Sequence, residues 1–363
     1  MKYIDEYRTE RLIRTLARKI KEEASQEYVF MEVCGGHTAA IHRFGIPSLL
    51  PGNINLLSGP GCPVCVTPLG FIDRAVALAM HEDVIITTFG DLIRVPGSVS
   101  SLEKEKVRGA DVRIVFSALD ALTLAANNKD KKIVFLGIGF ETTAPGTAAA
   151  LIKAKESGTD NFMVMCAHKI MPPAMEAIIS DGTLINGFIC PGHVATITGS
   201  NAFRFISEKY NLACVISGFE PTDIMLAVYM LVQQINNRQF KTEIQYSRAV
   251  TDEGNLKAQR LMNEVFELSD AGWRGLGTIK SSGLKIREKY VMFDAENVFQ
   301  INTEETDTSE DGTCLCGEVL RGRKKPPECR LFAKACTPEN PLGACMVSGE
   351  GACNAFYKYK RNG

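Results

Sequence analysis

KIVFLGIGFETTAP, residues 132–145, joins an apolar run to a Gly-Phe-Glu turn and then to a proline that can open a helix. A second stretch of the same form, ACVISGFEPTD at residues 213–223, has its Gly-Phe-Glu turn 79 residues further along the chain. A short run rich in Val, Ile and Phe that ends in a turn is typical of a buried strand. The two stretches therefore predict a weak internal repeat of strand–helix units.

Further apolar runs alternate with helical stretches between residues 28 and 237, an order that predicts parallel sheets with helices on both faces. The predicted strands are residues 28–33, 84–89, 112–116, 132–138, 162–166, 187–190 and 213–217. The predicted helices are residues 4–24, 69–80, 118–128, 145–156, 173–180, 222–237 and 252–267, the last capped by Thr251 or Asp252.

The domain organisation that we predict has three parts. Residues 1–130 form an N-terminal helix and a first Rossmann-like α/β unit, residues 131–240 a second unit, and residues 241–363 a cysteine-rich C-terminal region. This last region holds a Gly-rich stretch at 271–283 with the only tryptophan, Trp273, and an acidic surface loop at 302–312. Its tail is too short for an ordinary core, so we expect a metal or cross-links to hold it.

Composition excludes several classes of protein. The 363 residues carry 41 basic and 42 acidic side chains, so the charge excess expected of a nucleic-acid or anionic-membrane binder is missing. The uncharged stretch at 45–72 is interrupted by five prolines and five glycines, so we expect loop and strand packed inside protein rather than a membrane span. The charged N-terminus does not resemble a signal peptide, and we expect a cytoplasmic protein.

Twelve cysteines are the unusual feature of the composition, and half of them fall between residues 314 and 353. Without an export signal, metal or redox chemistry is a better interpretation than a disulfide framework. The tail contains no Cys-x-x-Cys knuckle, so its spacing favours an iron–sulfur cluster held by loops, and two of its six cysteines can form a redox pair. A structural zinc site or free thiols is the alternative. We therefore predict an α/β protein with two parallel-sheet units and a small C-terminal iron–sulfur domain.

A second constellation is GPGCPVCVTP at residues 59–68, which contains Cys62 and Cys65. Two residues between cysteines let the sulfurs meet in a small ring, as in dithiol–disulfide pairs. Thr67 as the cap and Pro68 at the first helical position would start a helix directly downstream. The positive end of that helix would lower the pKa of the thiols and make them reactive.

A third constellation, Cys34-Gly35-Gly36-His37, follows the strand predicted at 28–33. It places a thiol and an imidazole on one tight turn, which suits either a nucleophile with its base or two ligands of a transition metal. A buried cysteine and a histidine bonded to backbone are the structural alternative.

Weaker candidates follow other predicted strands. They are Glu141 and Glu220 of the two Gly-Phe-Glu turns, the pair His168-Lys169, and His193 after Cys190. Because open α/β sheets bind ligands at the carboxyl ends of their strands, these side chains can line one cleft. The glutamates can equally complement the positive ends of the helices that they precede. Cys166 and Cys214 are expected to be small buried hydrophobic residues.

These motifs resemble the HypD family, a family of maturation proteins for [NiFe] hydrogenases, from about residue 28 to residue 357. The motifs that carry the resemblance are CGGH at 34–37, GPGCPVC at 59–65, GFETTAP at 139–145, PGHV at 191–194 and the tail cysteines. One position departs from the family pattern Cys-Gly-x-His-x-His, because Ala39 stands at its second histidine. His42 is the nearest replacement.

The resemblance implies a role in assembling the iron centre of the hydrogenase with its cyanide and carbonyl ligands. It implies a complex with the chaperone HypC, cyanide delivered by HypE, Cys34 as the thiolate for the Fe(CN)₂CO iron with His37 close by, and Cys62 with Cys65 as a nearby dithiol. By analogy with ferredoxin:thioredoxin reductase, it implies a [4Fe–4S] cluster on Cys314, Cys329, Cys336 and Cys353, and a redox pair of Cys316 with Cys345. An iron–sulfur thiol oxidoreductase acting on a protein disulfide, or a zinc-stabilised interaction protein, are the alternatives.

Overall fold

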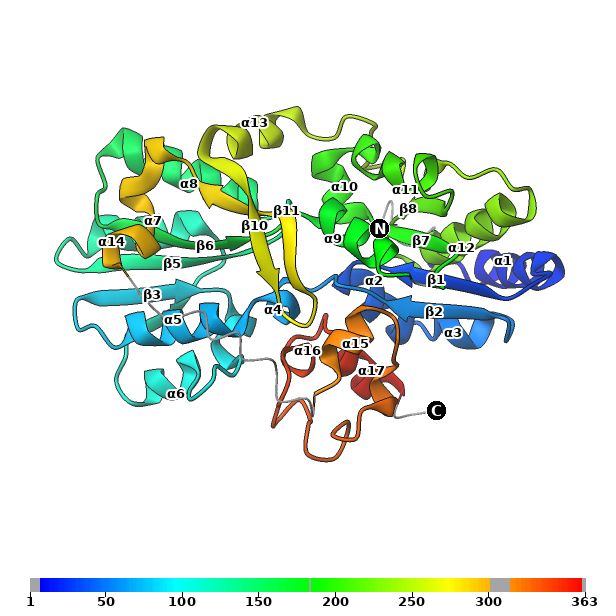
Figure 1. Cartoon of the computed structure of the whole chain (residues 1–363), viewed down its shortest axis with the longest axis horizontal. Coiled ribbons are helices and arrows are strands. Elements are labelled where there is room, and N and C mark those ends of the chain that lie inside the picture. The colour runs from blue at the N-terminus through cyan, green and yellow to red at the C-terminus, as the bar shows by residue number, and fades with distance from the viewer. Residues whose placement is uncertain (1–6, 183, 301–313, 361–363) are drawn as a thin grey trace.

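The computed structural model describes residues 7–182, 184–300 and 314–360, arranged as two parallel sheets with a cysteine-rich tail (Figure 1). Part of the helix predicted at 4–24 and the loop predicted at 302–312 lie outside these residues. Within the described ranges, no helix is both long enough and apolar enough to cross a membrane. The uncharged stretch at 45–72 forms short helices and a strand, but only its second part is packed inside the protein as predicted, because residues 59–67 are mostly buried whereas residues 47–49 and 52 are exposed.

Sheet A has five parallel strands in the order β2–β1–β7–β8–β9. Their bounds are β1 Tyr28–Glu32, β2 Ile54–Ser58, β7 Gly187–Pro191, β8 Ala213–Ser217 and β9 Thr242–Ile244. Sheet B has four parallel strands in the order β4–β3–β5–β6. Their bounds are β3 Val84–Thr88, β4 Val112–Ile114, β5 Lys132–Gly139 and β6 Phe162–His168. Two parallel sheets confirm the fold class predicted for this part of the chain.

The sequence order predicted a boundary between two α/β units at residue 130. The two sheets do not divide the chain there. β1 and β2 pair with β7, β8 and β9, whereas β3 to β6 form sheet B. The strand predicted at 28–33 and the strand predicted at 84–89 therefore lie in different sheets. Parallel strands are joined by crossovers, so the backbone can leave one sheet and return to it after building another.

Strands β1, β3, β5, β6, β7 and β8 are buried on both faces, which is the reason for their almost continuous apolar runs, whereas β2, β4 and β9 at sheet edges are only partly buried. Along β8, Ala213 and Val215 face one cluster of the core, and Cys214 and Ile216 face the other. The second cluster is shared, because it also contains residues of β3, β5 and β6. One cluster of the core therefore runs through both sheets.

Helices cover both faces of each sheet. Sheet A is covered by α1 Glu10–Glu23, α2 Gly35–Arg43, α3 Ile46–Leu49 and α12 Pro221–Asn236 on one face, and by α10 Gly192–Thr198, η3 Ser200–Phe203 and α11 Arg204–Glu208 on the other. Sheet B is covered by α7 Ala118–Asn127 and α8 Ala144–Ser157 on one face, and by α5 Leu69–Ala79, η2 Gly90–Arg94, α6 Leu102–Val107 and α9 Met171–Ser180 on the other.

After residue 240 the chain joins the two sheets. Helix α13 Leu256–Val265 is shorter than predicted and begins after Asn255, whose side chain accepts the N–H of Ala258, so the cap is neither Thr251 nor Asp252. The stretch predicted only as Gly-rich is an antiparallel hairpin of β10 Phe266–Trp273 and β11 Gly277–Ile286. Its tip reaches helix α4 Pro63–Val66 through the N–H of Arg274, which donates to Val66.

The tail lies below the junction of the two sheets in Figure 1. Its elements, and those that precede it, are η4 Glu288–Phe293, α14 Ala295–Phe299, α15 Cys316–Leu320, η5 Pro326–Glu328, α16 Ala344–Val347 and α17 Ala352–Lys360. Gly35, which follows β1, packs on Glu350, and Arg94, which follows β3, donates to the carbonyl of Val347. The carboxyl ends of both sheets therefore meet on one segment of the tail.

Candidate functional site

Cys34 lies two residues after the end of β1 and occupies the cap position of helix α2. Backbone N–H groups of Gly36 and His37 point at its sulfur and favour the thiolate. Burial outweighs them and raises the pKa of the thiol to about 12, and the carboxylates of Glu350 and Glu32 act in the same direction. The surroundings of Cys34 therefore favour the protonated thiol.

The loop that carries Cys62 lies directly against Cys34. The N–H of Gly35 donates to the carbonyl of Gly61 at 3.0 Å, and the N–H of Gly59 donates to the carbonyl of Glu32 at 2.7 Å. A Cβ atom on Gly61 would lie 2.4 Å from the backbone of Cys34, so only glycine allows this approach. The Cys34 turn and the Cys62–Cys65 loop, which are well separated in sequence, thus form one structural unit.

Cys62 and Cys65 lie on the two sides of the start of α4. Cys62 is the cap of this helix, Pro63 is its first residue, and the sulfur of Cys62 accepts the N–H of Cys65 at 3.4 Å. The helix that follows was predicted to have Thr67 as its cap and Pro68 as its first residue. In the structure Pro68 is the cap, and the helix, α5, begins one residue later at Leu69.

The predicted lowering of thiol pKa by a helix end is wrong for Cys65. Burial raises the pKa of Cys65 well above its ordinary value. Helix α4 has four residues, so it offers few aligned peptide dipoles to oppose that burial.

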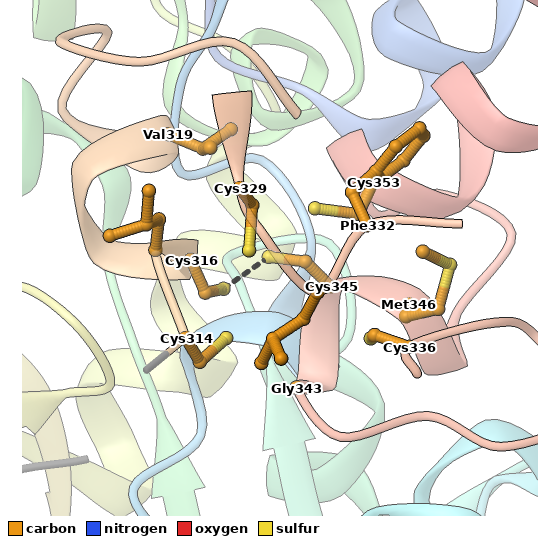
Figure 2. A pocket seen from close by; sticks show the side chains of 12 residues that line it. Cys314, Cys316, Val319, Cys329, Phe332, Cys336, Gly343, Cys345, Met346 and Cys353 are labelled. Carbon is orange, nitrogen blue, oxygen red and sulfur yellow. Dashed lines mark hydrogen bonds between the residues drawn. The ribbon is translucent and has the colours of Figure 1, made fainter. Parts of the chain in front are cut away.

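All six tail cysteines line one pocket (Figure 2). Cys316 and Cys345 place their sulfurs 2.6 Å apart, and both side chains are buried. The remaining four cysteines are Cys314, Cys329, Cys336 and Cys353. Burial and then the charges of the other three raise the pKa of Cys353, so these four thiols act on one another across the pocket.

The pocket fits an iron–sulfur cluster by its chemistry. It offers four thiols besides the close pair, and apolar side chains such as Val319, Phe332 and Met346 complete its wall. Among the residues that the structure describes, no three His, Cys, Asp or Glu side chains converge tightly enough to hold a single metal ion. Thiols spread around a pocket suit a cluster of several iron atoms better than one tetrahedral zinc.

Sulfur contacts lead from this pocket to the Cys62 loop. Cys65 contacts both Cys62 and Cys345, and its sulfur lies 3.8 Å from the carbonyl oxygen of Ala344. Cys345 in turn contacts Cys316, which contacts Cys314. A continuous line of cysteine side chains therefore joins Cys62, beside Cys34, to the tail pocket.

A second cavity, of about 690 Å³, opens on the other side of the Cys34 turn. Its lining residues are Gly36, His193, Phe219, Glu220, Tyr246, Arg248 and Ala249. His193 and Glu220 thus share one cavity, as their positions after neighbouring strands predicted.

Phe219 holds two imidazoles in this region. His37 stacks on it with ring centroids 4.4 Å apart, and His193 stacks on it at 3.8 Å. His37 Nε2 donates to the carbonyl of Gly218 at 2.9 Å, which leaves Nδ1 with a lone pair and, among the described residues, without a partner. Burial lowers the pKa of His37 to about 4, so its imidazole is neutral.

The cationic side chains of the cavity are paired. Arg248 forms a bidentate ion pair with the buried carboxylate of Asp223, at 2.8 and 2.5 Å. Arg8 pairs with Glu220. The cavity is therefore lined by aromatic rings and neutralised charges rather than by free cations.

Glu141, the other Gly-Phe-Glu glutamate, is not part of this cavity. It is buried just after the end of β5, where one carboxylate oxygen accepts the N–H of Met171 at 2.9 Å, and Phe140 beside it stacks on Trp273. Burial raises the pKa of Glu141 to about 7. The two turns of the repeat thus have different surroundings, one buried beneath the hairpin and one lining an open cavity.

The remaining cysteines and histidines lie elsewhere. Cys190 and Cys214 are buried on neighbouring strands with sulfurs 3.3 Å apart, and the thiol of Cys166 donates to the carbonyl of Leu284. His168 is buried and bonds to Thr147. His42 packs edge-on against Phe356 of the tail. Five residues along a helix correspond to a rotation of roughly 140°, so His42 does not share the direction of His37.

Sequence reasoning missed several residues of the site. Phe219, Tyr246, Arg248 and Asp223 line or support the cavity, and Glu32 and Glu350 lie at Cys34. Glu32 is a charged residue at the end of an apolar strand, a signal that could have identified it. Nothing local distinguishes Glu350 from the other acidic residues of the tail.

These features define a class of protein with two parallel α/β sheets, in which a cysteine turn, a Cys-x-x-Cys loop and a six-cysteine pocket converge. Residues 11–360 match the model of the HypD family, described as Hydrogenase formation hypA family. The chain is 48% identical to "Hydrogenase maturation factor HypD" of Azotobacter vinelandii, over 99% of this chain and 97% of that protein. It is 45% identical to the protein of the same name in Escherichia coli (strain K12), over 99% of each chain. The chain therefore belongs to the HypD family of hydrogenase maturation factors.

Proposed function

We propose that this chain holds the iron atom of the Fe(CN)₂CO group while that group is assembled for a [NiFe] hydrogenase, and that its cysteines act as redox partner. In this proposal HypC forms a complex with the chain and HypE delivers the cyanide. The observation that carries it is the continuous contact between the Cys34 turn, the Cys62–Cys65 loop and the six-cysteine pocket. Soft thiolate donors suit low-valent iron with cyanide and carbonyl ligands.

Cys34 is the residue assigned to the iron. Its sulfur lies at a helix start that stabilises negative charge, and its nearest charged neighbours are carboxylates. Within the part of the chain that the structure describes, no cation lies among the charged groups that act on this sulfur, and ferrous iron supplies that positive charge. Its binding therefore converts the thiol to a thiolate, and one proton is released to solvent.

Cys314, Cys329, Cys336 and Cys353 are assigned to a [4Fe–4S] cluster, which when bound supplies one-electron transfers. Cys316 and Cys345 are assigned to a redox dithiol beside it. When Cys62 and Cys65 form a disulfide, the Cys345 thiolate attacks Cys65 and Cys62 leaves as a thiolate. Cys316 then attacks Cys345 and releases Cys65. The exchange moves two electrons and two protons from the Cys316–Cys345 pair to the Cys62–Cys65 pair.

Infrared spectroscopy tests the proposal. The chain is purified anaerobically with HypC from cells that contain HypE, and cyanide and carbonyl stretching bands are expected in the wild-type complex. Cys34→Ala is expected to lose the bands, whereas Cys166→Ala, whose thiol bonds to Leu284 away from the site, keeps them.

Two results would contradict the proposal. Iron and sulfide without cyanide or carbonyl bands would support the thiol oxidoreductase that acts on a protein disulfide. A colourless protein that contains zinc would support the zinc-stabilised interaction protein.

A further inference from the structure

Glu350, which no cysteine motif includes, lies against the Cys34 turn. A Cβ atom on Gly35 would be 2.5 Å from the Cβ of Glu350 and 3.0 Å from its Oε2. Position 35 must therefore lack a side chain for Glu350 to come this close. Of the carboxylates that act on the sulfur of Cys34, Glu350 acts more strongly than Glu32.

The backbone of Glu350 is held firmly although its carboxylate is not. Its N–H donates to the hydroxyl of Ser348 at 3.3 Å, and that hydroxyl donates to Asp91 of η2 at 2.7 Å. The N–H of Gly351 donates to the carbonyl of Ser348 at 2.9 Å. These bonds fix the segment between the two sheets.

The carboxylate of Glu350 is available to a ligand. The residue is exposed, and among the residues of ranges 7–182, 184–300 and 314–360 its carboxylate has no hydrogen-bond or ion-pair partner. Glu32 differs, because its carboxylate accepts the N–H of Cys34 and the hydroxyl of Thr38. Of the two glutamates beside the thiol, Glu350 alone keeps its acceptor oxygens unused.

We propose that Glu350 is a second protein ligand for the ferrous ion at Cys34, an oxygen donor that binds before the cyanide and carbonyl ligands arrive. This inference rests on the proposed function, since it takes Cys34 to be the iron-binding thiolate. The thiol releases its proton to solvent when the ion binds, and together with the carboxylate it supplies two negative charges, which balance the charge of Fe²⁺.

An oxygen donor suits the first stage of such an assembly. Carboxylates bind hard divalent ions and leave them able to exchange ligands, whereas cyanide is a far stronger ligand for low-spin iron. Glu350 can therefore be displaced as cyanide binds, while the thiolate of Cys34 stays in place. The geometry assigns Glu350 to the capture of the ion and Cys34 to its retention.

Titration with Co²⁺ tests the inference, because a sulfur-to-cobalt charge-transfer band reports a bond to cysteine. The protein is the anaerobically purified full chain with its own iron content. The signal is the difference between the charge-transfer band of the wild type and that of Cys34→Ala, because this difference reports cobalt bound to Cys34. Glu350→Gln is expected to weaken Co²⁺ binding roughly ten-fold or more while the band itself remains. Glu350→Asp, which keeps a carboxylate, is expected to restore part of the affinity.

Glu339→Gln is the matched control, because Glu339 is another exposed glutamate of the tail, and it is expected to bind Co²⁺ as the wild type does. Equal iron content of all variants shows that the tail has folded. Wild-type affinity in Glu350→Gln, with the band still lost in Cys34→Ala, would overturn this inference and leave the proposed function intact. An unchanged band in Cys34→Ala would overturn both.

Discussion

The carbonyl oxygen of Gly61 accepts the N–H of Gly35 at 3.0 Å, which places the loop of Cys62 directly on the turn of Cys34. Gly61 must be a glycine because the two backbones approach more closely than a side chain allows, whereas Gly35 must be a glycine because Glu350 packs against it. A Cβ atom on Gly61 would meet the backbone of Cys34 at 2.4 Å. The two motifs therefore depend on each other for their position.

Gly61→Ala is expected to destabilise the protein by about 1–3 kcal/mol, because the new methyl group forces the two backbones apart. Chemical denaturation of both proteins measures the free energy of unfolding. Gly52→Ala is the control, since a Cβ atom there meets nothing within 4 Å. Equal losses in the two variants would show that the close packing at Gly61 does not matter.

Replacing single tail cysteines is expected to separate two roles. Cys353→Ser is expected to lower the iron and acid-labile sulfide of the purified chain, because it removes one of the four assigned cluster ligands. Cys345→Ala is expected to keep both and to impair formation of the cyanide and carbonyl bands, because it breaks the close pair with Cys316. Full assembly when both Cys316 and Cys345 are replaced would rule out the dithiol exchange.

Glu141→Gln is expected to change the pH dependence of stability. Because burial raises the pKa of Glu141 to about 7, the folded protein holds this proton more tightly than the unfolded chain, whose ordinary value is 4.5. The stability from this group is complete below pH 4.5 and is lost as the pH rises towards 7, with a total of roughly 3 kcal/mol. Glutamine cannot ionise, so unfolding free energies at pH 5 and pH 8 should differ less in the variant.

The control for that measurement is Glu339→Gln, which removes an exposed carboxyl group of the tail and shows what the substitution itself does to the measured stability. If Glu141→Gln loses as much stability between pH 5 and pH 8 as the wild type does, then Glu141 is already ionised in the folded protein at the lower pH.

Phe219→Ala is expected to raise the pKa of His193 towards its ordinary value. Burial lowers that pKa, and the ring of Phe219 supplies one face of the covering at a centroid distance of 3.8 Å. Titration of the histidine signals by NMR, with His193→Gln for assignment, measures the change. Phe116→Ala is the control, since its side chain is 92% exposed. An unchanged pKa would mean that other side chains desolvate the imidazole.

Most strands of the sheets could be predicted from the sequence, because a strand buried on both faces is a short apolar run with turn residues behind it. β2 was not predicted. Its sequence INLLS is short and lies in a stretch rich in proline and glycine, residues that are typical of loops. The hairpin was missed because glycines such as Gly272, Gly277 and Gly283 interrupt the alternation of its strands. The sorting of strands into sheets could not be predicted, because crossovers of similar length can join neighbours or distant strands.

The cysteines of the site could be predicted from their clustering, since half of the twelve fall between residues 314 and 353 and Cys62 forms a Cys-x-x-Cys pair with Cys65. Their convergence was implied only by the family resemblance. Glu350 and Arg248 could not be predicted, because an acidic or basic residue on a loop has no local pattern that reveals its long-range neighbour.

The interleaved sheets have a consequence for synthesis of the protein. Once a ribosome has released the chain to about residue 170, every strand of sheet B is available, whereas β1 and β2 still lack β7, their link to the rest of sheet A. A nascent chain can therefore complete the later sheet first and must keep an apolar two-stranded segment from aggregating until β7 emerges. A truncated product that stops before residue 187 would expose that edge and become a substrate for chaperones or proteases.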